Sequence, residues 1–186
     1  MSLRVVVGPM FAGKTSEIQR IVRRYARLGR SVLVLTADID NRYATNAIVN
    51  HDQAVLPARA VPVAGGLMGV LGWSEFAAAS AIVVDEAQFF VGCLIPFVQE
   101  AVDRCGKHVV VVGLDSDAEQ RPFGDVLALM AHADEIQKLT ALCLRCGDGT
   151  AAIFTRRVHA AASGAGPVEV GGADLYEPVC RRHFSA

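Results

Sequence analysis

The chain has 186 residues, of which 52% are apolar and 20% are charged, and its net charge is −1. This composition is typical of a globular protein. It shows no basic excess, so no nucleic-acid partner is expected. No apolar run is long enough to span a membrane, and the first residues lack the pattern of a signal peptide. We therefore expect a cytoplasmic protein with no membrane partner.

Strand-like apolar runs alternate with amphipathic segments over the first 139 residues. The pattern predicts strands at 4–8, 31–35, 81–84, 108–114 and 135–139, and helices at 14–28, 66–79, 93–105 and 124–133. From 36 to 58 the chain is polar, which predicts a long functional loop. Continuous Val, Ile and Leu strands between helices are typical of a parallel sheet covered on both faces, so the expected fold class is α/β.

The first predicted strand leads into the pattern Gly-x-x-x-x-Gly-Lys-Thr. Glycines in this pattern let the backbone turn tightly and direct N–H groups at phosphate oxygens, and the helix that follows adds its positive end. The lysine would reach the β- and γ-phosphates of a nucleoside triphosphate, and the threonine hydroxyl would bind Mg²⁺. The residues of this predicted phosphate loop are Gly8, Pro9, Met10, Phe11, Ala12, Gly13, Lys14 and Thr15.

A second motif is the buried strand at 81–84, which ends in two carboxylates, Asp85 and Glu86. In phosphate-loop proteins a carboxylate at this place holds Mg²⁺ opposite the hydroxyl of the loop, and Asp85 suits that role together with Thr15. Glu86 lies just beyond the strand, where it could accept a proton from an attacking hydroxyl group or water molecule.

After Leu139 the chain becomes richer in glycine and cysteine, which predicts a domain at 1–139 and a small second domain at 140–186. The chain has five cysteines, an odd number, so metal ligation is favoured over a disulfide framework. Cys143 and Cys146 form one Cys-x-x-Cys pair, and Cys180 and His183 form a Cys-x-x-His pair. Two such pairs supply the four ligands of a closed, structural Zn²⁺ site.

With these motifs in place, the chain resembles the thymidine kinase family of the cellular cytosolic and bacterial type. The Gly-Pro-Met-Phe form of the phosphate loop and the run Asp-Glu-x-Gln-Phe-Phe are specific to this family. The matches follow one another over nearly the whole chain, at 8–15, 40–43, 51–52, 85–90, 113–115, 122–124, 138–141 and 171–176 and at the two metal-ligand pairs.

The resemblance implies a RecA-like phosphate-loop fold with a zinc-binding lasso domain that contacts the nucleoside. It implies ATP-dependent phosphorylation of the 5′-hydroxyl of thymidine or deoxyuridine, with Glu86 as the general base. The implied ligands are ATP, Mg²⁺, structural Zn²⁺ and a dTTP feedback inhibitor, and the implied assembly is a homotetramer. Beyond the phosphate loop, the implied ATP-site residues are Asp40, Arg42, Asp85 and Gln88, and the implied nucleoside-site residues are Phe89, Leu114, Ala118, Val168, Glu169, Val170, Gly171 and Tyr176.

Two features depart from the family pattern. The family has an aromatic residue where this chain has Ala118, so an aromatic wall against the base is missing and base specificity is expected to be looser. The stretch from Gly147 to Thr155 is also longer than usual, so the resemblance does not assign Thr155 to the nucleoside pocket.

Two alternatives stay open. One is a zinc-ribbon phosphate-loop ATPase or switch, in which Glu86 would activate water instead of a sugar hydroxyl. The other is a related deoxynucleoside kinase with a different base preference, which Ala118 suggests.

Overall fold

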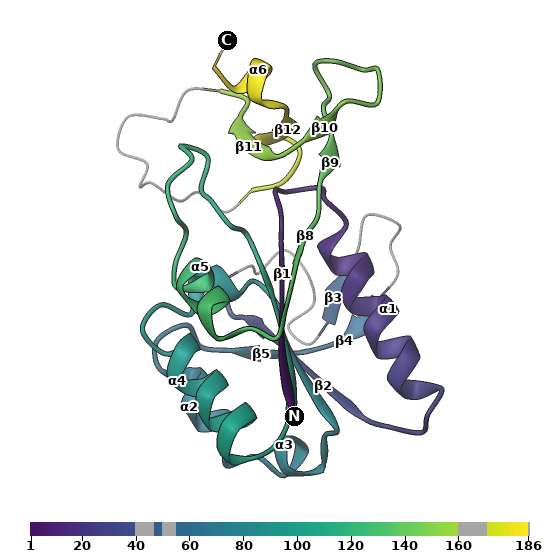
Figure 1. Cartoon of the computed structure of the whole chain (residues 1–186), viewed down its shortest axis with the longest axis vertical. Helices are drawn as coiled ribbons and strands as arrows, with labels where there is room; N and C mark the ends of the chain where they lie inside the picture. The colour runs from purple at the N-terminus through teal and green to yellow at the C-terminus, as the bar shows by residue number, and fades with distance from the viewer. Residues whose placement is uncertain (40–46, 50–54, 160–170, 186) are drawn as a thin grey trace.

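A computed structural model of the chain describes residues 1–39, 47–49, 55–159 and 171–185. Its centre is a six-stranded sheet in the order β5-β2-β6-β7-β1-β8, in which every neighbouring pair is parallel (Figure 1). The parallel sheet predicted from the sequence is therefore confirmed. The strands are β1 (Ser2–Val7), β2 (Val32–Ala37), β5 (Arg59–Val61), β6 (Ala81–Val84), β7 (His108–Gly113) and β8 (Glu135–Lys138).

Helices cover both faces of the sheet, with a separate apolar core on each face. On one face α1 (Lys14–Ala26) packs Ile18 and Ile21 against valines of β1, β2, β6 and β7. On the other face the larger core includes Phe76, Phe97 and Leu129. The helices of that face are α2 (Gly66–Val70), α3 (Ser74–Ala78), α4 (Leu94–Gln99) and α5 (Val126–Leu129) (Figure 1).

The helices on this second face are shorter than the sequence predicts. The segment predicted as one helix at 66–79 divides into α2 and α3, with Gly72 between them, because glycine is unfavourable in a helix interior. The predicted helix at 93–105 is α4 continued by a π-helical turn, η2 (Glu100–Arg104), and α5 is followed by the 3₁₀ turn η3 (Met130–His132). Within the described ranges, none of the helices has the length and apolarity that a membrane span needs.

The polar stretch at 36–58 is not only a loop. It contains β3 (Ala47–Val49) and β4 (Val55–Pro57), which form an antiparallel pair, and the sheet then adds β5 at its edge. These strands have three residues each, which is too short to show an alternating pattern against polar neighbours. The prediction of a loop at 36–58 was wrong for β3 and β4.

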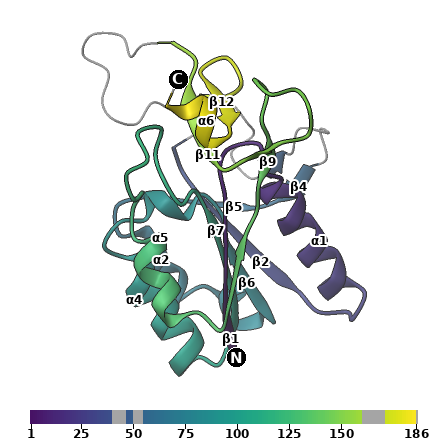
Figure 2. The same cartoon turned by 45° about the horizontal axis from the view of Figure 1, so that its top comes forward.

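In its described residues, the segment after β8 forms a small unit of two antiparallel pairs and one helix. Its elements are β9 (Ala141–Leu142), β10 (Ala151–Ala152), β11 (Phe154–Arg157), β12 (Tyr176–Val179) and α6 (Arg181–Phe184). Figures 1 and 2 both show this unit beyond the carboxyl ends of β1 and β8. Its entrance is fixed to the sheet, because the Leu139 N–H donates to the Val7 carbonyl at 2.8 Å.

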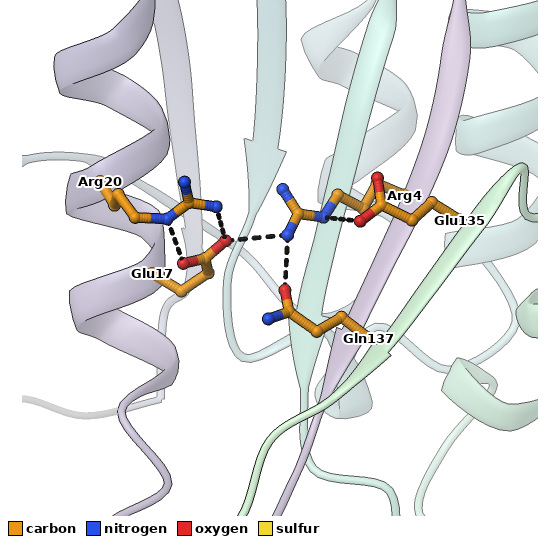
Figure 3. A network of polar contacts seen from close by, with 5 residues as sticks. All are labelled: Arg4, Glu17, Arg20, Glu135 and Gln137. Carbon is orange, nitrogen blue, oxygen red and sulfur yellow. Dashed lines mark hydrogen bonds and ion pairs between the residues drawn. The ribbon is translucent and has the colours of Figure 1, made fainter.

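A polar network joins α1 to the edge of the sheet (Figure 3). Arg4 of β1 contacts Glu17 of α1 at 2.9 Å and donates to Gln137 of β8 at 2.5 Å. Glu17 also accepts two hydrogen bonds from Arg20. These bonds, assisted by the charges of Arg20 and Arg4, lower the pKa of Glu17 below its usual value. The network holds the first turns of α1, and with them the end of the preceding loop, against β1 and β8.

Gly124 is required for the packing of the loop after β7. Its φ is +60°, and an added Cβ would lie 2.2 Å from the carbonyl oxygen of Gln88. Gly29, at the end of α1, has a similar φ of +65°, but an added Cβ would have no neighbour within 4 Å. We expect Gly29→Ala to cost only the left-handed backbone strain, about 1–2 kcal/mol. Gly124→Ala should cost about 1–3 kcal/mol more, because the backbone of Gln88 must move.

Urea denaturation of the two variants measures this difference in unfolding free energy. Equal losses of stability in Gly29→Ala and Gly124→Ala would show that the close approach to Gln88 has no energetic weight.

Candidate functional site

The predicted phosphate loop connects β1 to α1 through a tight backbone turn. Phe11 and Gly13 have φ values of 63° and 81°, so the chain turns back on itself before α1 begins at Lys14. Gly8 lies so close to the β8 end that an added Cβ would be 2.6 Å from the Leu139 carbonyl oxygen. Thr15 is the second residue of α1, at the helix end that favours anions.

Lys14 folds over its own loop. Its Nζ donates to the carbonyl oxygens of Gly8 at 3.1 Å and of Pro9 at 2.7 Å. Burial lowers the pKa of Lys14 from its usual value, while the charges of Glu86, Asp85 and Asp115 oppose that shift. The lysine therefore lies within electrostatic reach of three carboxylates.

Asp85, one of these carboxylates, lies in a desolvated environment. It follows β6 directly and is buried, with 5% of its surface exposed. Burial, and secondly the charge of Glu86, raise the pKa of Asp85 to about 7. A carboxylate and a hydroxyl group are oxygen donors of the kind that Mg²⁺ prefers, so Asp85 and Thr15 suit that ion chemically.

Glu86 is held in a left-handed conformation, with φ of 51°. Its backbone N–H donates to the Asp85 carboxylate at 2.9 Å, and its own carboxylate accepts from the Gln88 side-chain amide at 2.5 Å. A glutamate in this region costs conformational energy and persists only where its surroundings fix it. The carboxylate of Glu86 is thus oriented before any substrate binds.

Gln88 is fully buried and connects two strand ends. Its Nε2 donates to Glu86, and its Oε1 accepts from the Leu114 N–H at 3.0 Å. Gly113 leaves the space that this side chain occupies, because an added Cβ there would lie 2.7 Å from Oε1. The structure describes Gln88 as a link between Glu86 and the end of β7, whereas its contact with ATP stays a prediction.

The residues predicted for nucleoside binding come from three places. Phe89 follows Glu86 in the 3₁₀ turn η1 (Ala87–Phe89), and its ring packs edge-on against Phe123, with centroids 5.4 Å apart. Leu114 and the half-buried Ala118 lie in the chain after β7. Gly171 and the buried Tyr176 belong to the small C-terminal unit. The other predicted site residues lie outside the described residues: Asp40, Arg42, Val168, Glu169 and Val170.

Sequence reasoning did not select Asp115, Phe123 or Lys138 as site residues. Asp115 is buried, and one of its carboxylate oxygens accepts from Lys138 at 2.6 Å. Its other oxygen, Oδ1, has no hydrogen-bond partner within the part of the chain that the structure describes. The position of Asp115 in the sequence could have indicated a site, since it follows the end of β7 much as Asp85 follows β6.

The four predicted metal ligands converge in the C-terminal unit. The Nδ1 atom of His183 lies 3.5, 3.3 and 3.6 Å from the sulfur atoms of Cys143, Cys146 and Cys180, and the last two sulfurs are 3.8 Å apart. A tetrahedral Zn²⁺ with bonds of about 2.3 Å to sulfur and about 2.0 Å to nitrogen would separate its ligand atoms by about 3.5–3.8 Å. The cluster could therefore hold zinc.

The surroundings favour a thiolate at one cysteine of the cluster, Cys143, whereas burial and the neighbouring Cys143 and Cys180 side chains raise the pKa of Cys146 to about 11. Burial opposes charge on Cys143, but hydrogen bonds from the Cys180 N–H and from His183, among others, lower the pKa of Cys143 to about 6. Thiolate is the form of cysteine that binds metal ions.

The fold and site define a class: an α/β phosphate-loop protein with carboxylates at the neighbouring strand ends and a Cys₃His cluster in an added unit. The family model described as "Thymidine kinase" matches residues 1–184. The chain belongs to this family, as the sequence motifs predict.

Curated relatives agree with this assignment. "Thymidine kinase" of Oryza sativa subsp. japonica is 42% identical and aligns with 98% of this chain, which spans 65% of that relative's length. "Thymidine kinase a" of Arabidopsis thaliana is 39% identical over 98% of this chain and 74% of the relative. "Thymidine kinase" of Deinococcus radiodurans is 42% identical over 78% of this chain and 71% of the relative.

The raised pKa of Asp85 predicts a pH-dependent stability in magnesium-free buffer. Between about pH 4 and about pH 7 the native carboxyl keeps a proton that the unfolded chain has released, so the unfolding free energy falls as pH rises through this window. Asp85→Asn removes this titration and retains an oxygen acceptor for the Glu86 N–H. Its stability relative to the unchanged chain should therefore rise by about 2–4 kcal/mol across the window.

Urea denaturation at a series of pH values, without a chelator, measures this difference. Asp117→Asn is the control of opposite sign: burial raises the pKa of Asp117, but hydrogen bonds from Arg121 and Glu119 outweigh it and hold the pKa below its usual value. The stability that Asp117 contributes is lost only at lower pH, so the difference between Asp117→Asn and the unchanged chain should be constant from about pH 5 to about pH 8. A constant difference for Asp85→Asn as well would contradict the assignment.

Proposed function

We propose that this chain transfers the γ-phosphoryl group of ATP to the 5′-hydroxyl of thymidine or deoxyuridine, a reaction of nucleotide salvage. The products would be the nucleoside monophosphate and ADP. Membership of the thymidine kinase family supports the proposal. The observation that carries it at the site is the Glu86 carboxylate, oriented at the end of β6 within electrostatic reach of Lys14.

On the donor side, the loop N–H groups and the N-terminal end of α1 would bind the phosphates. Lys14 now donates to the carbonyl groups of Gly8 and Pro9, and it would exchange these neutral acceptors for β- and γ-phosphate oxygens. Thr15 and Asp85 would hold Mg²⁺, which when bound neutralises charge on the phosphate oxygens. Burial raises the pKa of Asp85 to about 7. A bound Mg²⁺ would lower this pKa again, because a nearby positive charge favours the ionised carboxylate.

On the acceptor side, Glu86 would take the proton of the 5′-hydroxyl as its oxygen attacks the γ-phosphorus. The bond between that phosphorus and the β–γ bridging oxygen breaks, and ADP leaves with the electron pair. Lys14 would stabilise the charge that develops on the transferring group. The hydrogen bond from Gln88 holds the acceptor oxygens of Glu86 in place without occupying both of them.

The base of the nucleoside would be bound by Phe89, Leu114, Ala118 and Tyr176, with the segment from Val168 to Gly171. Phe123 is added to this set because its ring packs against Phe89. An aromatic ring is therefore present beside Phe89 although position 118 is an alanine. Thymidine is the preferred substrate in this proposal, and a related kinase with another base preference is the alternative.

Further parts of the proposal follow from the family and concern the whole molecule. We infer a cytoplasmic homotetramer that is inhibited by dTTP. We also infer a division into an ATP-binding domain at 1–139 and a zinc-binding lasso domain at 140–186, whose metal ion would order the segment over the nucleoside.

Replacing the proposed base tests the function. Glu86→Gln retains an oxygen acceptor for Gln88 but cannot take a proton, so kcat should fall by about 10²–10⁴-fold. The assay measures formation of monophosphate from ATP and a panel of pyrimidine and purine deoxynucleosides, with circular dichroism as the control for folding.

A fully active Glu86→Gln enzyme would contradict the role of Glu86 as the general base. Clear thymidine preference by kcat/KM excludes the alternative kinase. ATP hydrolysis that needs no nucleoside would instead favour the zinc-ribbon ATPase or switch.

Gln88 should act as a positioning residue for Glu86. In Gln88→Glu the acceptor for the Leu114 N–H is retained, but a second carboxyl replaces the amide donor and has to share a proton with Glu86, which weakens Glu86 as a base. Gln88→Met loses both amide groups. We expect both variants to lower kcat by roughly 10-fold, about 1.4 kcal/mol, with little change in the KM for ATP. If only Gln88→Met loses activity, and in proportion to its stability, the residue has a packing role alone.

A further inference from the structure

The phosphate loop packs directly against the core of the C-terminal unit. That core consists of the buried residues Ala141, Cys143, Ala152, Val179 and Cys180, two of which are metal ligands. Phe11 and Ala12, at the centre of the loop, lie against this cluster together with Phe154 and Phe184. Two segments that are distant in sequence therefore share one small apolar core, at the carboxyl end of β1 (Figure 2).

A hydrogen bond also joins the phosphate loop to the C-terminal unit. The Met10 N–H, a backbone donor of the loop, donates to the hydroxyl oxygen of Thr155 at 2.9 Å. Thr155 lies on β11 and is buried, with 3% of its surface exposed. An N–H group in such surroundings is costly to leave unpaired, so the hydroxyl fixes the orientation of the peptide between Pro9 and Met10.

The two neighbours of Thr155 join it to the metal cluster. The Phe154 ring packs against Phe184, with centroids 5.1 Å apart, and the Arg156 guanidinium donates to the His183 carbonyl at 2.7 Å. Thr155 itself pairs with Pro178 on β12, just before Cys180. The ligand pair on α6 is thus connected through β11 and β12 to the backbone of the phosphate loop.

We propose that the Cys₃His unit fixes the geometry of the phosphate loop through Thr155, so that metal binding and nucleoside triphosphate binding strengthen each other. Thr155 is then a positioning residue of the donor site, a role separate from the ordering of a nucleoside segment. The inference rests on the proposed function, because ATP is the ligand proposed for the loop. Coupling between two sites is reciprocal, so each ligand should increase the affinity for the other by the same factor.

The first test measures the affinity of the metal-loaded protein for a non-hydrolysable ATP analogue with Mg²⁺, by calorimetry and without nucleoside. Thr155→Val removes the acceptor for Met10 and should weaken binding about three- to ten-fold while the metal content stays complete. Thr155→Ser restores the hydroxyl and should restore the affinity. Thr140→Val, the same change at an exposed threonine of the C-terminal unit, is the matched control and should bind the analogue normally.

The second test starts with the unchanged protein, so its main outcome does not depend on the folding of a variant. The rate of zinc release to a chromogenic chelator should fall when the ATP analogue is present, and this protection should be smaller in Thr155→Val. The coupling would be overturned if Thr155→Val bound the ATP analogue with unaltered affinity and the analogue did not change the rate of zinc release.

These outcomes separate the inference from the proposed function. If the metal-loaded protein phosphorylates thymidine and binds the analogue but shows no coupling, only the inference fails. If it binds no ATP analogue at all, the proposed function fails and the inference fails with it.

Discussion

Val7, the last residue of β1, pairs in register with Gly113 of β7 on one side and with Lys138 of β8 on the other. The phosphate loop, Asp115 and the entrance to the C-terminal unit therefore start from the same edge of the sheet, the one formed by the carboxyl ends of the strands. Parallel strands require this convergence, because all their carboxyl ends face one way. The electrostatic influence of three carboxylates on Lys14, and the approach of Gly8 to Leu139, depend on that shared edge.

The packing around Gln88 fixes the orientation of the Glu86 carboxylate at this edge. A fully buried amide is stable only where its donor and acceptor groups find partners, and here the partners are the Glu86 carboxylate and the Leu114 N–H. Gly113 leaves space for this amide, and Gly124 leaves space for the backbone of Gln88. The left-handed backbone of Glu86 is consistent with an active-site residue that its surroundings hold in place, at a cost in local stability.

The sequence predicts the sheet, the phosphate loop and the metal ligands because each depends on residues close together or on strong periodicity. The strands β3, β4 and β5 have only three residues each, so they could not be recognised from pattern alone. Long-range partners were also beyond the reach of the sequence: nothing in the spacing of Thr155 shows that its hydroxyl meets Met10. Asp115 was missed for a different reason: its position after β7 and in the family match at 113–115 was visible, but neither was used to assign it a role.

The contact between Phe11 and the C-terminal core restricts positions that the phosphate-loop pattern leaves open. The positions between the two glycines are formally unrestricted, because phosphate is bound by backbone groups that every residue has. In this chain two of those side chains, Phe11 and Ala12, pack against the core of the C-terminal unit, so their size has to fit that core. A loop transplanted from another phosphate-binding protein would satisfy the pattern and still leave a hole in a neighbouring core.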